Sequence, residues 1–137
     1  MSVPPDLFPV VRQWVEKAEE DFRAAEHTLT LEKDCPHGTV CFHAQQCVEK
    51  YLKALLVFHT VPFPKIHDLL ELLPLVPRTI GLGIQPVDVA ALNRYAVEGR
   101  YPGEWEPITR HDAEAAVETA RKVREAIRRY LPEAVWG

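Results

Sequence analysis

Residues 41–56 carry several side chains that can bind a charged ligand, and they lie within an otherwise apolar stretch of the chain. In a helix, with about 100° between successive residues, six polar side chains gather on one face. These six, which we call the polar stripe, are His43, Gln45, Gln46, Glu49, Lys50 and Lys53. The opposite face is apolar and should pack on a core. We therefore expect a packed helix that exposes a selected set of polar groups.

A zinc site could be drawn from His43 and Cys47, which are one helical turn apart, with Cys35 and His37 upstream. However, the chain has no paired Cys-x-x-Cys and no His-Glu-x-x-His sequence. Cys47 would face the apolar side, where cysteine packs as a small hydrophobic residue. The sequence also lacks a Gly-x-Ser-x-Gly elbow and a phosphate-binding glycine loop. We expect no metal, no cofactor and no catalytic residue of these classes.

His67 and Asp68 stand at the start of a short apolar segment. They could form a polar couple in a cleft, or one of them could cap a short helix. The cap is favoured, because aspartate is common at that position.

Two arginines and two tyrosines gather near the end of another predicted helix: Arg94, Tyr95, Arg100 and Tyr101. Arginine with tyrosine can hold a phosphate and stack on a base. Equally, the tyrosines could be half-buried packing residues and the arginines could pair with carboxylates.

Length and composition indicate one globular domain over residues 1–137, with 47% apolar and 26% charged residues. The formal net charge of -4 gives no general attraction to nucleic acid. Three cysteines, an odd number, suit a reducing cytoplasm better than a disulfide framework. We find no signal peptide, and no apolar stretch approaches the roughly 20 residues of a membrane span.

Prolines and the spacing of apolar residues divide the chain into five predicted helices, and nothing alternates like a surface strand. The helices span about 6–31, from a Thr39 cap to about 59, 66–73, from Pro86 to about Tyr101, and from a Thr109 and Asp112 cap to about 131. This pattern predicts an all-α, antiparallel up-and-down helical bundle with three long and one or two short helices, and with the second helix near its centre.

Four motifs occur in order along the chain. They are Ala18-x-x-Asp21-Phe22-x-x-Ala25, then Phe42-x-Ala44-Gln45-Gln46-x-Val48-Glu49-Lys50-Tyr51-Leu52-Lys53-Ala54-Leu55-Leu56, then Lys65-x-His67-Asp68-Leu69 with Leu72-Leu73, and finally Arg100-Tyr101-Pro102 before an alanine-rich helix. The second motif is the most specific. Together they resemble the HEPN domains (higher eukaryotes and prokaryotes nucleotide-binding), in particular short stand-alone prokaryotic members.

This resemblance implies a helical bundle that is commonly a homodimer and is often encoded beside a minimal nucleotidyltransferase, in a two-component or toxin-antitoxin system. Many HEPN proteins are metal-independent ribonucleases, whose signature is an arginine, four to six residues, and a histidine. Here the positions after Arg100 hold Trp105, Glu106 and Pro107, and His111 follows Arg100 by eleven residues. Arg23 and His27 are one residue too close and lie on the first helix. The signature is absent.

The leading interpretation is therefore a non-catalytic HEPN protein that binds a nucleotide or another phosphorylated ligand and pairs with a minimal nucleotidyltransferase. The expected ligand-binding residues are Lys50, Lys53, His67, Asp68, Arg100 and Tyr101. The lysines and Arg100 would contact phosphate, and Tyr101 would stack or pack. One alternative is a metal-independent ribonuclease toxin with a non-standard site formed across a dimer. The other is a pure interaction module whose polar stripe is an interface.

Overall fold

The computed structural model describes residues 7–96 and 107–137, and these residues contain helices and connecting segments without strands. The helices are α1 (Phe8–Leu29), α2 (His37–Phe58), α3 (Leu69–Leu72), the 3-10 turn η2 (Leu73–Leu75), α4 (Pro86–Asn93), α5 (Arg110–Arg128) and α6 (Glu133–Trp136). The prediction of an all-α bundle with three long helices is confirmed. Among the described residues, no helix is long and apolar enough to cross a membrane.

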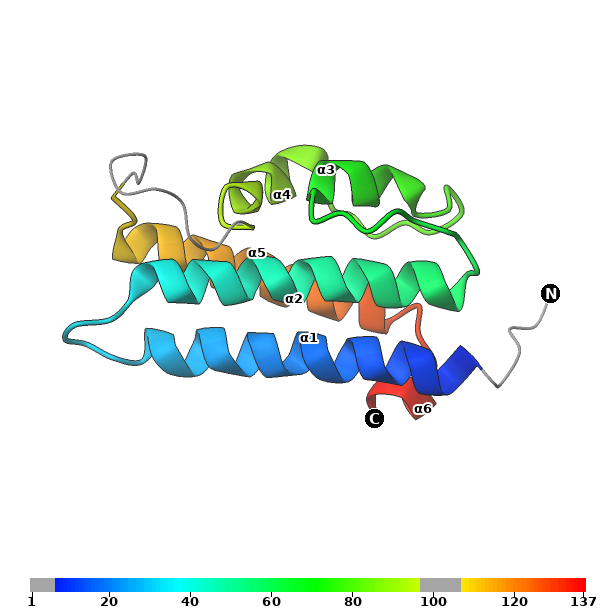
Figure 1. The fold of residues 1–137 in the computed structure, drawn as a ribbon, viewed down its shortest axis with the longest axis horizontal. Coiled ribbons are helices and arrows are strands. Elements are labelled where there is room, and N and C mark those ends of the chain that lie inside the picture. Colours follow the sequence, from blue (N-terminus) through cyan, green and yellow to red (C-terminus); the bar gives the residue numbers. More distant parts are fainter. Residues whose placement is uncertain (1–6, 97–106) are drawn as a thin grey trace.

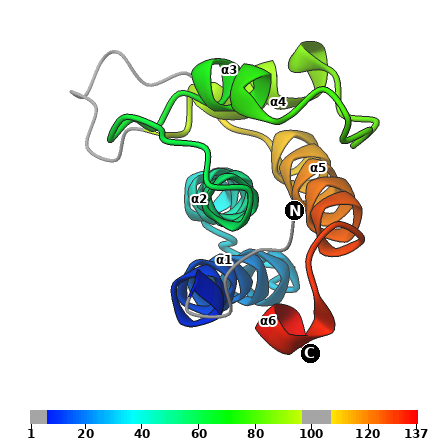
Figure 2. The ribbon, with the colours of Figure 1, turned by 90° about the vertical axis from the view of Figure 1, so that its right-hand side faces the viewer.

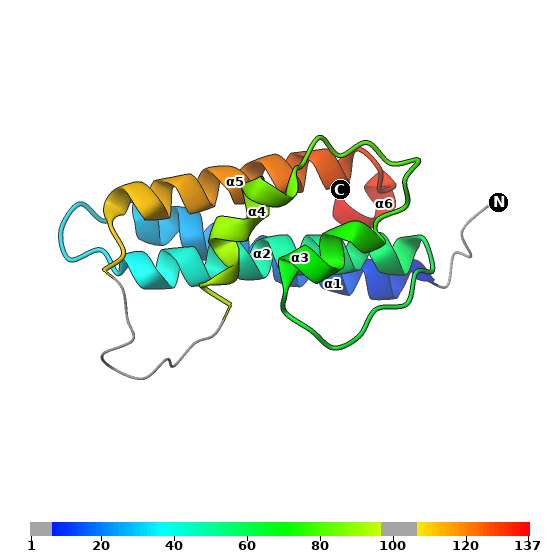
Figure 3. The ribbon, with the colours of Figure 1, turned by 90° about the horizontal axis from the view of Figure 1, so that it is seen from above.

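Helix α1 runs antiparallel to α2, and α5 runs in the same direction as α2 (Figure 1). The parallel arrangement of α2 and α5 is achieved because the intervening segment with α3 and α4 lies across both of them (Figure 3). Viewed from the end, α1, α5 and the layer of α3 and α4 are arranged around α2 (Figure 2). Helix α2 therefore occupies the central position that its apolar sequence predicted.

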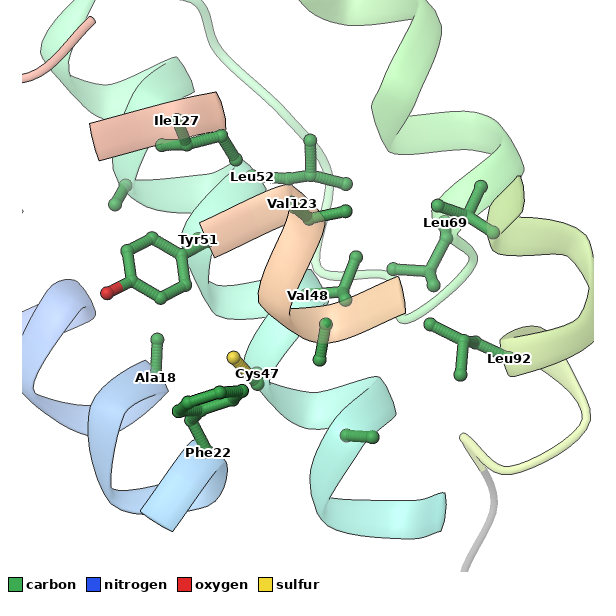
Figure 4. Close-up of a cluster of buried hydrophobic side chains, with 14 of the residues drawn as sticks. Ala18, Phe22, Cys47, Val48, Tyr51, Leu52, Leu69, Leu92, Val123 and Ile127 are labelled. Carbon is green, nitrogen blue, oxygen red and sulfur yellow. The ribbon is translucent and has the colours of Figure 1, made fainter. Parts of the chain in front are cut away.

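The core is formed by apolar side chains of α2 packed against every neighbouring long or short helix. Figure 4 shows Cys47, Val48, Tyr51 and Leu52 of α2 beside Ala18 and Phe22 of α1, Val123 and Ile127 of α5, and Leu69 and Leu92 of the α3 and α4 layer. All ten residues are at most 5% exposed. Burial of one large apolar side chain contributes roughly 1.5–3 kcal/mol, so the central helix supplies much of the stabilising free energy.

The start of α5 agrees with the predicted cap, whereas the start of α2 differs from it. The Thr109 side chain accepts a hydrogen bond from the Asp112 amide, and the Asp112 carboxylate accepts one from the Thr109 amide, as predicted. By contrast, α2 begins at His37, and the predicted Thr39 cap is wrong. The Pro36 carbonyl already accepts from the Thr39 amide at 3.0 Å, which places Thr39 inside the first turn.

The fourth helix was expected to reach Tyr101, but α4 ends at Asn93. The Asn93 side chain accepts a hydrogen bond from the Leu69 amide and donates one to Asp68, which ties the end of α4 to the start of α3. Helix α6 was not predicted; it packs on α1, where the Arg12 guanidinium donates to the Ala134 carbonyl at 2.6 and 3.1 Å.

A partly buried carboxylate on α1 joins the three long helices. Glu19 accepts hydrogen bonds from the Tyr51 hydroxyl and from the Arg124 guanidinium, and it pairs with Arg128 at 2.8 Å. Burial raises the pKa of Glu19, but the bonds from Arg124 and Tyr51 and the two positive charges outweigh burial and bring the pKa below its ordinary value of 4.5. The ionised carboxylate is therefore favoured by the folded state.

We expect Leu52→Ala to reduce the free energy of unfolding by about 2–5 kcal/mol, because Leu52 is 1% exposed and its removal leaves a cavity in the core. Urea denaturation checks this value. Leu31→Ala is the matched control: Leu31 is 48% exposed, and its truncation should change stability by less than about 1 kcal/mol. Equal losses for the two variants would contradict the central position of α2.

Glu19→Gln should weaken the pH dependence of stability. Because the pKa of Glu19 is lowered by folding, its contribution is present above the ordinary value of 4.5 and is lost as the pH falls below it. We expect a smaller difference in unfolding free energy between about pH 7 and about pH 3 in the variant than in the wild type. Glu16→Gln, an exposed position on the same helix, should retain most of the wild-type difference.

Candidate functional site

The polar stripe of α2 is divided between buried and partly exposed residues. Gln45, Glu49 and Lys53 are at most 5% exposed, so the expectation that the whole stripe faces solvent is wrong for these three. The segment between α2 and α3 covers them: its Phe63 ring lies near Lys53, and the His67 carbonyl faces Gln45. His43, Gln46 and Lys50 remain partly exposed.

One cluster forms around Asp21, which extends from α1 and is 8% exposed. Its Oδ1 lies 2.8 Å from His43 Nδ1, and its Oδ2 accepts a hydrogen bond from Lys50 Nζ at 2.6 Å. His43 and Lys50 lie two helical turns apart, and the carboxylate binds both of them. We call Asp21, His43 and Lys50 the Asp21 cluster. It holds an imidazole and an ammonium group in fixed positions, with side chains that are 30% and 24% exposed.

A second cluster forms around Glu49. Lys53 Nζ donates to Glu49 Oε2 at 3.0 Å, and His67 Nδ1 lies 3.0 Å from each carboxylate oxygen. Gln45 Nε2 donates to Glu49 Oε1 at 3.2 Å and to the His67 carbonyl at 3.3 Å. We call Gln45, Glu49, Lys53 and His67 the Glu49 cluster. The Glu49 side chain is 4% exposed whereas that of His67 is 66% exposed, so a buried carboxylate holds a surface imidazole.

The Lys53 ammonium has aromatic neighbours as well as a carboxylate partner. Its Nζ lies 5.6 Å from the centre of the Trp14 ring and 5.8 Å from that of Phe63. The two rings contact each other edge to face. Cation–π attraction of this kind helps to compensate the desolvation of the ammonium.

Asp68, Arg100 and Tyr101 were also predicted to bind a ligand, and none of them belongs to either cluster. Asp68 caps α3, as favoured from the sequence, because its Oδ1 accepts from the Leu70 amide at 2.9 Å and from Asn93 Nδ2 at 2.7 Å. Arg100 and Tyr101 lie outside the described residues. Of the predicted residues, the structure thus brings Lys53 and His67 together at Glu49, whereas Lys50 binds Asp21. Asp68 directly follows His67 in the chain.

The ligand-binding residues expected from the sequence did not include Asp21 or His43. A signal for Asp21 was available: it stands among Ala18, Phe22 and Ala25, on the apolar face of the first helix. A carboxylate at such a position needs a cationic or hydrogen-bonding partner, and His43 and Lys50 of the polar stripe supply it.

The described residues contain no group of three His, Cys, Asp or Glu side chains arranged to hold a metal ion. Cys41 and Cys47 are fully buried, and burial raises the pKa of the Cys41 thiol to about 11 and raises that of Cys47 as well. At neutral pH both groups are thiols rather than reactive thiolates.

Comparison with known proteins identifies the fold family. Residues 11–130 match the family model of the HEPN domain. The chain belongs to the HEPN family. A relative in Methanocaldococcus jannaschii, named "Putative toxin MJ1304", is 30% identical over 145 aligned positions, which cover 88% of this chain and 87% of the relative.

Two solved structures share this HEPN fold. The crystal structure of TT1696 from Thermus thermophilus has a TM-score of 0.72 and 28% identity, and the match covers 88% of this chain and 98% of TT1696. The crystal structure of ST0689, an archaeal HEPN homologue, has a TM-score of 0.65 and 22% identity, with 88% and 96% of the two chains covered. The family resemblance found in the sequence motifs is therefore confirmed.

Within this HEPN domain, His111, the histidine that follows Arg100 at a greater distance than the ribonuclease signature allows, is exposed. His111 lies in the first turn of α5. The preceding Arg110 is occupied in structural contacts, because its guanidinium donates to the carbonyls of Leu29 and Leu31 at 2.7 and 3.1 Å. These bonds tie the start of α5 to the end of α1.

Glu49→Gln should destabilise this HEPN domain by about 3–5 kcal/mol, because it leaves the ammonium group of Lys53, whose side chain is 7% exposed, without a charged partner. Chemical denaturation measures the loss. The double variant Glu49→Gln/Lys53→Met should recover a large part of it, since no unpaired charge remains buried.

The matched control for this pair is Glu20→Gln. Glu20 pairs with Lys17 at the surface, where the two side chains are 58% and 65% exposed, and such pairs contribute about 1 kcal/mol or less. A Glu49→Gln loss no larger than that of the control would show that the Glu49 cluster does not stabilise the fold.

Proposed function

We propose that this HEPN protein is one component of a two-protein toxin-antitoxin system, in which it binds a nucleotide or another phosphorylated ligand and pairs with a minimal nucleotidyltransferase. The observation that carries the proposal is the 30% identity to the M. jannaschii relative with toxin in its name, across 88% of this chain. We further propose that the protein forms a homodimer.

The Asp21 cluster supports the ligand-binding part of the proposal. Lysine has three N–H donors, and the hydrogen bond from Lys50 to Asp21 uses one of them. The partly exposed ammonium can therefore donate to a phosphate oxygen without breaking its bond to Asp21. A cation that is already oriented loses less conformational entropy on binding than a free surface lysine would.

The proposed role is binding rather than RNA cleavage, because the sequence lacks an arginine and a histidine at the separation of HEPN ribonucleases. Metal-independent cleavage requires a cation for the phosphate and a well-placed imidazole for proton transfer. His111 and Arg100 are eleven positions apart in the chain. A ribonuclease site would thus depend on residues outside the usual signature.

The experiment has three arms, each using the purified protein of residues 1–137. We expect a tagged copy to retain a short nucleotidyltransferase encoded by the neighbouring gene, and the two to elute together in size-exclusion chromatography. Isothermal titration with ATP, GTP and AMP should give heat of binding. Incubation with structured RNA in EDTA should leave the RNA intact.

Each arm has a contradicting result. Separate elution of the two proteins would overturn the pairing, and the absence of heat with all three nucleotides would overturn the nucleotide role. RNA cleavage in EDTA that is lost in His111→Ala or Arg100→Ala would favour the ribonuclease alternative. A stable complex without any nucleotide binding would favour a pure interaction module.

A further inference from the structure

We infer that the polar stripe binds the phosphate chain of a nucleoside di- or triphosphate through His43, Lys50 and His67, while Lys53 acts behind them as a positioning residue. This inference rests on the proposed nucleotide role. It specifies which residues contact the nucleotide and that they contact its phosphate chain. It also assigns different roles to the two lysines: Lys50 contacts the ligand, and Lys53 positions another residue.

The two histidines are held in the same way. In each case Nδ1 lies against a buried carboxylate, Asp21 at 2.8 Å for His43 and Glu49 at 3.0 Å for His67. An ionised carboxylate only accepts hydrogen bonds, so Nδ1 must carry the proton in both rings. When the ring is protonated, Nε2–H becomes a second donor on the far side of the imidazole. Both rings can then offer an oriented N–H to an anion.

The two carboxylates do not repel such an anion strongly, because they are covered and paired. The Asp21 and Glu49 side chains are only 11% and 4% exposed. Each has a lysine partner, so the formal charges of Asp21 and Lys50 sum to zero, as do those of Glu49 and Lys53. Protonation of the two imidazoles adds two positive charges at the surface, and a ligand with several negative charges favours that protonation.

The spacing favours a phosphate chain over a single phosphate. His43 and Glu49 are six residues apart on α2, which corresponds to about 9 Å along the helix axis. Lys50 follows Glu49 directly, so the Asp21 cluster and the Glu49 cluster border each other on the helix. One phosphate group is too small to contact both His43 and the His67 ring held by Glu49, whereas two or three linked phosphates can do so. All three contacts are with phosphate, and the identity of the base should matter little.

Lys53 is too deeply buried to share this role directly. Its side chain is 7% exposed, is bound to Glu49 and lies near the Trp14 and Phe63 rings. Its ammonium group donates to the buried Glu49 carboxylate, and that carboxylate in turn holds the His67 ring in place. Gln45 supports the same arrangement, because its amide donates both to Glu49 and to the His67 carbonyl. Oriented supporting groups of this kind are needed wherever a binding residue must be preorganised.

The first test is a ligand series by isothermal titration, without Mg²⁺ and with EDTA. We expect ATP and ADP to bind about tenfold or more tightly than AMP, ATP and GTP to bind alike, and adenosine to give no heat. Titrations in buffers of different ionisation enthalpy should reveal proton uptake on binding. The charged groups facing the two imidazoles are Asp21, Lys50 and Glu49, and Lys53 acts through Glu49.

The second test uses variants. His67→Gln, His43→Gln and Lys50→Met should each weaken ATP binding about tenfold, and the two histidine variants should also reduce the proton uptake. The matched controls His27→Gln and Lys17→Met alter exposed positions of α1 and should bind ATP like the wild type. Circular dichroism confirms that each variant is folded.

The positioning role of Lys53 predicts a result that a direct ligand contact would not give. Lys53→Met should reduce both affinity and proton uptake to the level of His67→Gln, and combining the two should bring no further loss, because both act at the same imidazole. Lys50→Met combined with His67→Gln should give a larger loss than either alone. If Lys53→Met instead adds fully to His67→Gln, Lys53 contacts the ligand itself and the assignment is wrong.

The outcomes separate this inference from the function on which it rests. ATP binding that is unchanged in the His43, Lys50 and His67 variants would overturn the site and leave the nucleotide role intact. AMP binding as tight as that of ATP would overturn the phosphate-chain contact. The absence of heat with any nucleotide would overturn the nucleotide role and this inference together.

Discussion

The burial of α2 is the constraint on which the rest of the structure depends. The helix lies between α1, α5 and the layer of α3 and α4. Every residue from Tyr51 to Leu56 is buried. A charged group in such a position costs several kcal/mol unless it is paired and hydrogen-bonded. The carboxylates that lie on or against α2 are accordingly paired: Glu19 with Arg124 and Arg128, Asp21 with Lys50, and Glu49 with Lys53.

These pairs link separate elements as well as neutralising charge. Glu19 connects α1 to α5, Asp21 connects α1 to α2, and Glu49 connects α2 to the segment before α3 through His67. Apolar packing alone tolerates small shifts of one helix along another, whereas a short hydrogen bond between charged groups does not. The polar contacts therefore fix the register of the helices, and the same contacts orient the side chains that reach the surface.

The sequence predicted the arrangement of α2 better than its surroundings. Apolar spacing and proline positions were sufficient to predict the three long helices, and the motif from Phe42 to Leu56 was sufficient to suggest the family. Periodicity, however, gives only the angle of a side chain around its own helix. It placed Lys50 and Lys53 on one face but could not show that Phe63 and Trp14 would cover Lys53. Helix α6 was missed because four residues contain too few apolar positions to show a period.

The HEPN fold by itself does not determine which of its surfaces is used. The relatives with 28% and 22% identity share the bundle, and a shared bundle is compatible with different sites. Arg100 and His111, which were compared with the ribonuclease signature, stand in the sequence before α5 and in its first turn. The Asp21 and Glu49 clusters are instead built from α1, α2 and the segment before α3. The absence of the ribonuclease signature therefore does not affect these clusters, and their carboxylates still require the imidazoles and ammonium groups that they hold.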